Sequence, residues 1–188
     1  MFKELSFIVG AAALVAATGA QAHAVPPSRF LETAKPYAPY EFLIGDWYSK
    51  VPGENLTLHQ QFRWGPGNAY IMYSTYLVAP GQPEQLHFEG LMVWNGKSKA
   101  LDFLFAVQPP SGAEEKGTVT AGSDGTVVRE VEMTDSSGKA EHFRQTFRKG
   151  DAGTVVTSLT QQTAKGWQAS GPGDLVMERH QATADASR

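Results

Sequence analysis

The sequence predicts an all-β protein, an up-and-down antiparallel β-barrel of about ten strands. Three observations support this class. Clusters of turn-forming residues recur at regular spacing after residue 50, the segments between them alternate apolar and polar residues, and helical periodicity is scarce beyond residue 39. Closing such a meander into a barrel removes both exposed sheet edges, which would otherwise pair with other chains.

Residues 1–22, MFKELSFIVGAAALVAATGAQA, have the features of a secretory signal peptide. Lys3 precedes an apolar run over residues 7–17, and small residues follow it. The run is shorter than the roughly 20 residues that cross a bilayer, which argues against a membrane anchor. Cleavage after Ala22 or after Ala24 fits the pattern. We therefore expect a bacterial protein that is periplasmic or secreted.

The rest of the chain is predicted to form one domain. Residues 23–39 are a proline-rich lead with a short helical turn over 28–34, residues 40–181 are the barrel, and residues 182–188 are a disordered tail. The chain has 188 residues and no cysteine, so no disulfide supports the fold. The absence of thiols also excludes thiolate metal sites and thiol catalysis.

Turn sequences such as VPGEN, GPGN, NGKSK and GSDG separate the predicted strands. The last segment is predicted either as one strand or as two strands separated by SGPGD at 170–174. The predicted strands cover residues 43–50, 56–64, 68–79, 85–95, 99–108, 114–121, 125–134, 139–149, 153–162 and 166–180.

Period-two alternation gives most of these segments one aromatic-rich face, which is expected to line the barrel interior. Isolated polar residues share the inner faces. A barrel of this size is wider than side chains alone can fill. We predict a ligand-binding cavity lined by Gln60, Phe62, Tyr76, Phe88, Met92, Phe103, Arg129, Phe143 and Gln145. The histidines fall on outward faces and are scattered, so no metal site is predicted.

Arg129 is the most informative inward residue, since a buried cation needs a partner. A ligand carboxylate would suit its planar guanidinium group. Two alternatives stay open: a one-residue register error would place Arg129 in solvent, and an inward glutamate would pair with it.

The segment FLIGDW at residues 42–47 is expected to begin the barrel. Gly45 lets the backbone bend as the strand enters, and Trp47 fills one end. A cation from the last strand, Arg179, is predicted to lie across the indole ring of Trp47. These three residues are structural closure residues.

The FLIGDW motif, the strand count and an arginine in the last strand resemble the calycin superfamily, and in particular an uncharacterised bacterial lipocalin-like family related to the nitrobindins. The resemblance covers residues 40–181 and extends to the hairpin HFEGLMVWNGKSKALDFLF. It implies a barrel that encloses a hydrophobic ligand. Nitrobindins bind haem through a histidine near the C-terminus, which only His180 matches. The sequence YSKVPGEN after Trp47 departs from the glycine-rich stretch of nitrobindins.

The predicted function is non-enzymatic binding of a small apolar or amphipathic molecule, with no cofactor. One alternative is a calycin-like isomerase, cyclase or hydratase that acts on an apolar substrate. Another is a scaffold protein whose barrel is filled by Phe88, Phe103, Phe105, Phe143 and Phe147. The net charge of −3 and the interspersed charges argue against a nucleic-acid partner. No second apolar segment suggests a membrane span, and the oligomeric state is left open.

Overall fold

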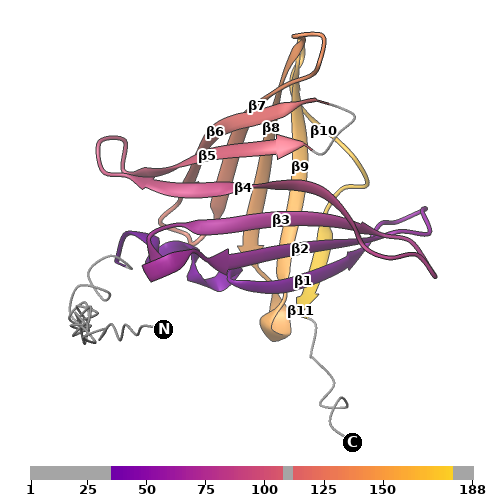
Figure 1. Ribbon diagram of the computed structural model, residues 1–188, viewed down its shortest axis with the longest axis horizontal. Coiled ribbons are helices and arrows are strands. Elements are labelled where there is room, and N and C mark those ends of the chain that lie inside the picture. Colours follow the sequence, from indigo (N-terminus) through magenta and orange to yellow (C-terminus); the bar gives the residue numbers. More distant parts are fainter. Residues whose placement is uncertain (1–34, 108–111, 180–188) are drawn as a thin grey trace, which may run out of the picture.

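The computed structural model describes residues 35–107 and 112–179. These residues form a closed antiparallel barrel of ten strands with one additional strand, as the sequence predicts (Figure 1). The strands are β1 (Gly45–Lys50), β2 (Thr57–Trp64), β3 (Ile71–Val78), β4 (Gln85–Asn95), β5 (Ala100–Val107), β6 (Glu114–Ala121), β7 (Val127–Thr134), β8 (Ala140–Lys149), β9 (Val155–Thr163), β10 (Gly166–Ala169) and β11 (Leu175–Arg179).

The barrel is closed by β11, which lies between β9 and β1. Each of the strands β1 to β9 pairs with the next one along the chain. Met177 of β11 pairs with Val155, and Arg179 pairs with Trp47. The predicted last strand is thus divided into β10 and β11. β10 pairs with the C-terminal half of β9 and lies outside the closed ring.

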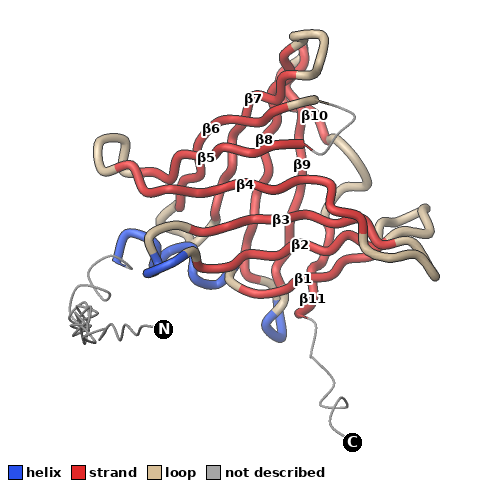
Figure 2. Tube along the Cα trace, in the orientation of Figure 1, coloured by secondary structure: helices blue, strands red, loops and turns tan. Residues whose placement is uncertain are grey.

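One end of the barrel is covered by the 3₁₀ helix η1 (Lys35–Leu43). Two shorter 3₁₀ turns, η2 (Pro66–Asn68) and η3 (Asp151–Gly153), lie in the β2–β3 and β8–β9 connections. Figure 2 shows these helical segments in blue at the edges where the strands begin or end. The helical turn predicted at 28–34 and the signal peptide lie outside the described residues. The observed helix begins at Lys35 and includes residues that the sequence analysis placed in the lead and the first strand.

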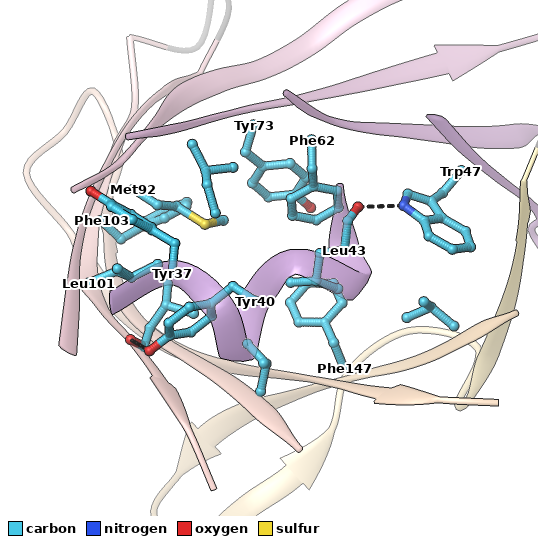
Figure 3. Close-up of a cluster of buried hydrophobic side chains, with 14 of the residues drawn as sticks. Tyr37, Tyr40, Leu43, Trp47, Phe62, Tyr73, Met92, Leu101, Phe103 and Phe147 are labelled. Carbon is cyan, nitrogen blue, oxygen red and sulfur yellow. Dashed lines mark hydrogen bonds between the residues drawn. The ribbon is translucent and has the colours of Figure 1, made fainter. Parts of the chain in front are cut away.

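Side chains of η1 fill the barrel end. Tyr37, Tyr40 and Leu43 are buried, and the Trp47 Nε1–H donates a 2.6 Å hydrogen bond to the Leu43 carbonyl. Figure 3 shows η1 crossing this end with its side chains between those of the strands. The hydrophobic core of this half also contains Phe62, Ile71, Met92, Leu101, Val119, Val127, Phe147, Val155 and Met177.

The tyrosine hydroxyl groups of η1 are satisfied by the barrel backbone. Tyr37 donates to the Ala69 carbonyl at 2.6 Å and accepts from the Trp94 N–H at 2.8 Å. Tyr40 donates to the Val119 carbonyl at 3.1 Å. These bonds fix η1 to three separate parts of the barrel, so this end is closed to solvent. None of the helices among residues 35–107 and 112–179 is long and apolar enough to cross a membrane.

Candidate ligand cavity

The half of the barrel away from η1 contains a cavity of about 260 Å³. It lies at the end of the barrel where the 79–84 turn connects β3 to β4 and the 135–139 turn connects β7 to β8. The cavity is lined by Leu58, Gln60, Tyr73, Thr75, His87, Phe88, Phe105, Glu115, Arg129, Met133, Phe143, Gln145 and Leu159. The barrel is therefore filled in one half only, and the hypothesis of a solid interior is wrong.

A layer of polar side chains separates the filled half from the cavity. The Gln60 amide donates to the Tyr73 hydroxyl, and the Gln145 amide donates to the Thr157 hydroxyl at 3.0 Å. The Tyr73 ring stacks on Phe62 at 4.4 Å between centroids. Burial raises the pKa of Tyr73, so this phenol stays protonated at neutral pH. The cavity floor is thus polar and uncharged at Gln60, Tyr73 and Gln145.

Arg129 points into the barrel and pairs with Glu115. The Arg129 Nη1 lies 2.7 Å from the Glu115 Oε2, and both side chains are less than a tenth exposed. The guanidinium also lies 4.9 Å from the centre of the Phe103 ring. Of the alternatives for Arg129, the inward glutamate is the one present. The pair leaves this part of the wall with no net charge.

Two buried polar atoms of the same layer have no hydrogen-bond partner among the described residues. They are the Gln60 Oε1 and the Arg129 Nε. A buried donor or acceptor without a partner costs roughly 1–3 kcal/mol. Both atoms belong to residues that line the cavity.

His87 lines the cavity because a β-bulge interrupts the alternation of β4. Thr75 pairs with Phe88 but Tyr76 pairs with Leu86, which leaves His87 as the extra residue. Its ring lies edge-on to Phe88 at 4.1 Å. Burial lowers the pKa of His87, and the nearby Glu115 offsets part of this effect. The imidazole is therefore neutral at pH 7.

The structure places five of the predicted ligand-binding residues on the cavity wall: Gln60, Phe88, Arg129, Phe143 and Gln145. Three others, Phe62, Met92 and Phe103, point inward but belong to the filled core. They lie at the level of η1 or just below the polar layer, so their contacts are with other side chains.

Tyr76 was placed in the cavity, and this prediction is wrong. Tyr73 and Thr75 point inward on β3, so Tyr76 lies on the outer face. There it stacks at 5.1 Å on His59, which also stacks on Tyr48 at 4.2 Å. The His59 ring nitrogens lie 2.9 Å from Glu84 and 3.2 Å from Asp46. This outward histidine is buried by its neighbours on the barrel surface.

The sequence analysis missed Glu115 and His87. Alternation in β6 would have identified Glu115, because it shares a face with the buried Val119. His87 could not be found in this way, since its position depends on the bulge. Tyr73 and Thr75 follow from the alternation of β3 in the same manner as Glu115.

The three closure residues meet at the junction of β1 and β11. The Arg179 guanidinium lies 4.5 Å from the centre of the Trp47 ring, and its Nη2 donates to the Ile44 carbonyl at 2.9 Å. Gly45 has φ of 144°, and a Cβ there would lie 2.9 Å from the Arg179 Nη1. The absence of a side chain at Gly45 therefore makes room for the cation.

The proposed haem ligand His180 lies outside the described residues. Within residues 35–107 and 112–179, no cluster of three or more His, Asp or Glu side chains could hold a metal ion. Sites for drug-sized ligands occupy about 300–1,000 Å³. The cavity of about 260 Å³ lies below this range, and haem binding through His180 stays a prediction.

Comparisons with known proteins do not assign this chain to a family. No protein-family model matches the sequence, and no curated protein is significantly similar to it. The closed ten-strand antiparallel barrel is compatible with a calycin-like fold.

Proposed function

We propose that this protein binds a small, neutral, amphipathic molecule inside the barrel. The observation that carries the proposal is the cavity of about 260 Å³, whose apolar walls converge on a polar layer. Apolar cavities with a few convergent polar groups are the usual form of small-molecule sites. The volume suits a ligand smaller than a typical drug.

The ion pair between Arg129 and Glu115 supports a neutral ligand. An anion at Arg129 would lie close to the Glu115 carboxylate, and a cation at Glu115 would lie close to the guanidinium. Either charge would also lose its hydration in an apolar cavity, which is costly without a full counter-charge. A hydroxyl or carbonyl group avoids both costs. We therefore propose a neutral ligand instead of the carboxylate ligand that the sequence analysis expected at Arg129.

The proposal includes a calycin-like fold and export from the cytoplasm. The closed meander and the Trp47–Arg179 contact support the first, and the sequence of residues 1–22 supports the second.

Ligand binding is tested by native mass spectrometry of protein purified from its own host, followed by titration with benzyl alcohol and benzoate. We expect a retained small molecule, and at least tenfold weaker binding of benzoate than of benzyl alcohol. Equal binding of the two probes would contradict a neutral site.

Two variants show whether binding occurs in the cavity. Met133→Trp adds a large ring to the cavity wall, whereas Thr118→Trp adds the same ring to an exposed outer position. We expect Met133→Trp to abolish binding and Thr118→Trp to leave it unchanged. Retention of the small molecule by Met133→Trp would contradict binding at this place.

A second candidate function, proton transfer on a bound carbonyl compound, is favoured by His87. A neutral imidazole on a cavity wall can accept an α-proton, leaving an enolate that is then protonated from the imidazolium. The test is deuterium exchange into acetophenone in D₂O. Faster exchange with the wild type than with His87→Gln would support an enzyme, and equal rates would exclude this activity for His87.

A further inference from the structure

A second hollow of about 210 Å³ lies beside the cavity, between the barrel and the segment 170–174. Its lining is mostly apolar or uncharged: Val51, Leu58, Gln145, Thr157, Ser158, Leu159, Ser170, Gly171, Pro172, Gly173 and Leu175. It is on the β1 and β9 side of the barrel, opposite the Glu115–Arg129 pair on β6 and β7.

The two hollows share part of their lining. Leu58, Gln145 and Leu159 belong to both linings, so they form the partition between them. Gln145 is tied to Thr157 by a 3.0 Å hydrogen bond. Leu58 and Leu159 are only partly buried, and their side chains are aliphatic. A change of their rotamers breaks no hydrogen bond, so it would join the hollows at small cost.

The outer wall of the second hollow is a loop, because the neighbours of β9 change at this point. β11 pairs with β9 up to Thr157, and β10 pairs with it from Thr160 onward. Between them, the chain 170–174 takes the place of a strand. It is held at one end by the Ser170 N–H donating to the Leu159 carbonyl at 2.9 Å, and at the other by the Arg148–Asp174 ion pair.

We propose that the two hollows form one elongated site for a neutral amphiphile with a single alkyl chain. The polar head lies at the layer formed by Gln60, Arg129 and Glu115. The chain passes between Leu58 and Leu159 and ends under segment 170–174. This inference rests on the proposed function and adds the ligand class and the direction in which the ligand lies.

The test is calorimetric titration with 1-alkanols from 1-butanol to 1-dodecanol. Each methylene buried in an apolar site increases affinity about fourfold. In the wild type we expect this increase to continue past the chain length that fills the first cavity, and to stop at the length that fills both.

Leu159→Phe enlarges the partition and is expected to stop the increase at a shorter chain. Leu175→Phe narrows the second hollow on the side away from the partition. It should lower the chain length at which affinity stops increasing, although the partition residues are unchanged. Binding of 1-butanol should stay within about twofold of the wild type in Leu175→Phe, because Leu175 lines the second hollow and not the first cavity. Val176→Phe changes an exposed neighbour on β11 and serves as the matched control.

The outcomes distinguish this inference from the proposed function. If 1-butanol binds but the limiting chain length is the same in the wild type and both variants, the cavity binds ligand and the second hollow does not take part. If no alkanol binds, the proposed function is wrong and the elongated site with it.

Discussion

The buried ion pair of Arg129 and Glu115 determines, at the scale of single residues, which ligands the cavity accepts. Alternation placed Arg129 inside the barrel, and the structure agrees. Sequence alone could not select its partner, since pairing depends on which residue of β6 lies beside β7. Register pairs Arg129 with Val119, and the guanidinium reaches diagonally to Glu115.

We predict that Arg129→Met lowers the free energy of unfolding by about 3–5 kcal/mol, because it leaves Glu115 buried and unpaired. The double variant Arg129→Met/Glu115→Leu should recover most of this loss, since it removes both charges. Urea denaturation measures both effects.

The matched control is Glu130→Gln, which removes a carboxylate from the solvent-exposed pair that Glu130 forms with Arg144. Its effect should stay below about 1 kcal/mol. A double variant as unstable as Arg129→Met alone would show that the two charges are not coupled.

His87 should make stability depend on pH. Burial lowers its pKa from the usual 6.5, so the folded state favours the neutral ring. The unfolded chain then binds more protons below pH 6.5, and folding stability falls as the pH decreases through that value toward the lower folded-state pKa.

In His87→Gln this part of the pH dependence should be absent, whereas His142→Gln, at an outward and exposed imidazole, should keep it. The measurement is urea denaturation at several pH values between 5 and 8. Parallel pH profiles for the wild type and His87→Gln would contradict a buried neutral His87.

At the scale of elements, the helix η1 stabilises the barrel without taking part in the cavity. No periodic pattern in KPYAPYEFL predicts it: a 3₁₀ helix with an internal proline lacks the spacing of an amphipathic α-helix. The strands, in contrast, were predicted to within three residues at each end, because each is bounded by turn residues and alternates in polarity.

Leu43→Ala should cost about 2–5 kcal/mol of unfolding free energy, because this side chain is fully buried at the centre of the η1 end. Binding of benzyl alcohol should be unchanged, since the cavity lies beyond the polar layer. Glu41→Ala, at an exposed position of η1, is the control. A loss of affinity in folded Leu43→Ala would show that the two halves are coupled.

The junction of β1 and β11 depends on Gly45. Gly45→Ala should destabilise the protein by more than about 1 kcal/mol, because φ of 144° is strained for a residue with a Cβ and the new atom would displace Arg179. Gly96→Ala is the matched control, since its φ is ordinary and a Cβ there meets only the Trp94 Nε1 at 3.8 Å. Thermal denaturation compares the two. Equal unfolding midpoints for Gly45→Ala and Gly96→Ala would show that the Arg179 side chain moves aside for the new Cβ without loss of stability.

At the scale of the whole molecule, the barrel combines a filled half and a hollow half. The sequence predicted the closed meander and its inward aromatic faces. It could not predict which inward side chains pack in the core and which line the cavity. That division depends on η1 and on the bulge at His87, and neither follows from alternation. This is why Phe62, Met92 and Phe103 were placed in the cavity.

Hydrogen exchange should reveal the closed ring. Strands β2 to β8 are paired on both sides, whereas β10 pairs only with β9 among the described strands. We expect the amides of β10 to exchange much faster than those of β2 or β7, measured by mass spectrometry of peptides. Equal protection of β10 and β7 would contradict a strand outside the ring.

The polar layer has one more consequence, for protein engineering. The filled core on the η1 side of the polar layer contains most of the fully buried apolar side chains. We therefore expect residues on the cavity side of this layer to tolerate substitution. Libraries at Leu58, Met133 and Leu159 would sample new specificities while the filled core stays unchanged. A cysteine-free barrel organised in this way is suited to expression in reducing as well as oxidising compartments.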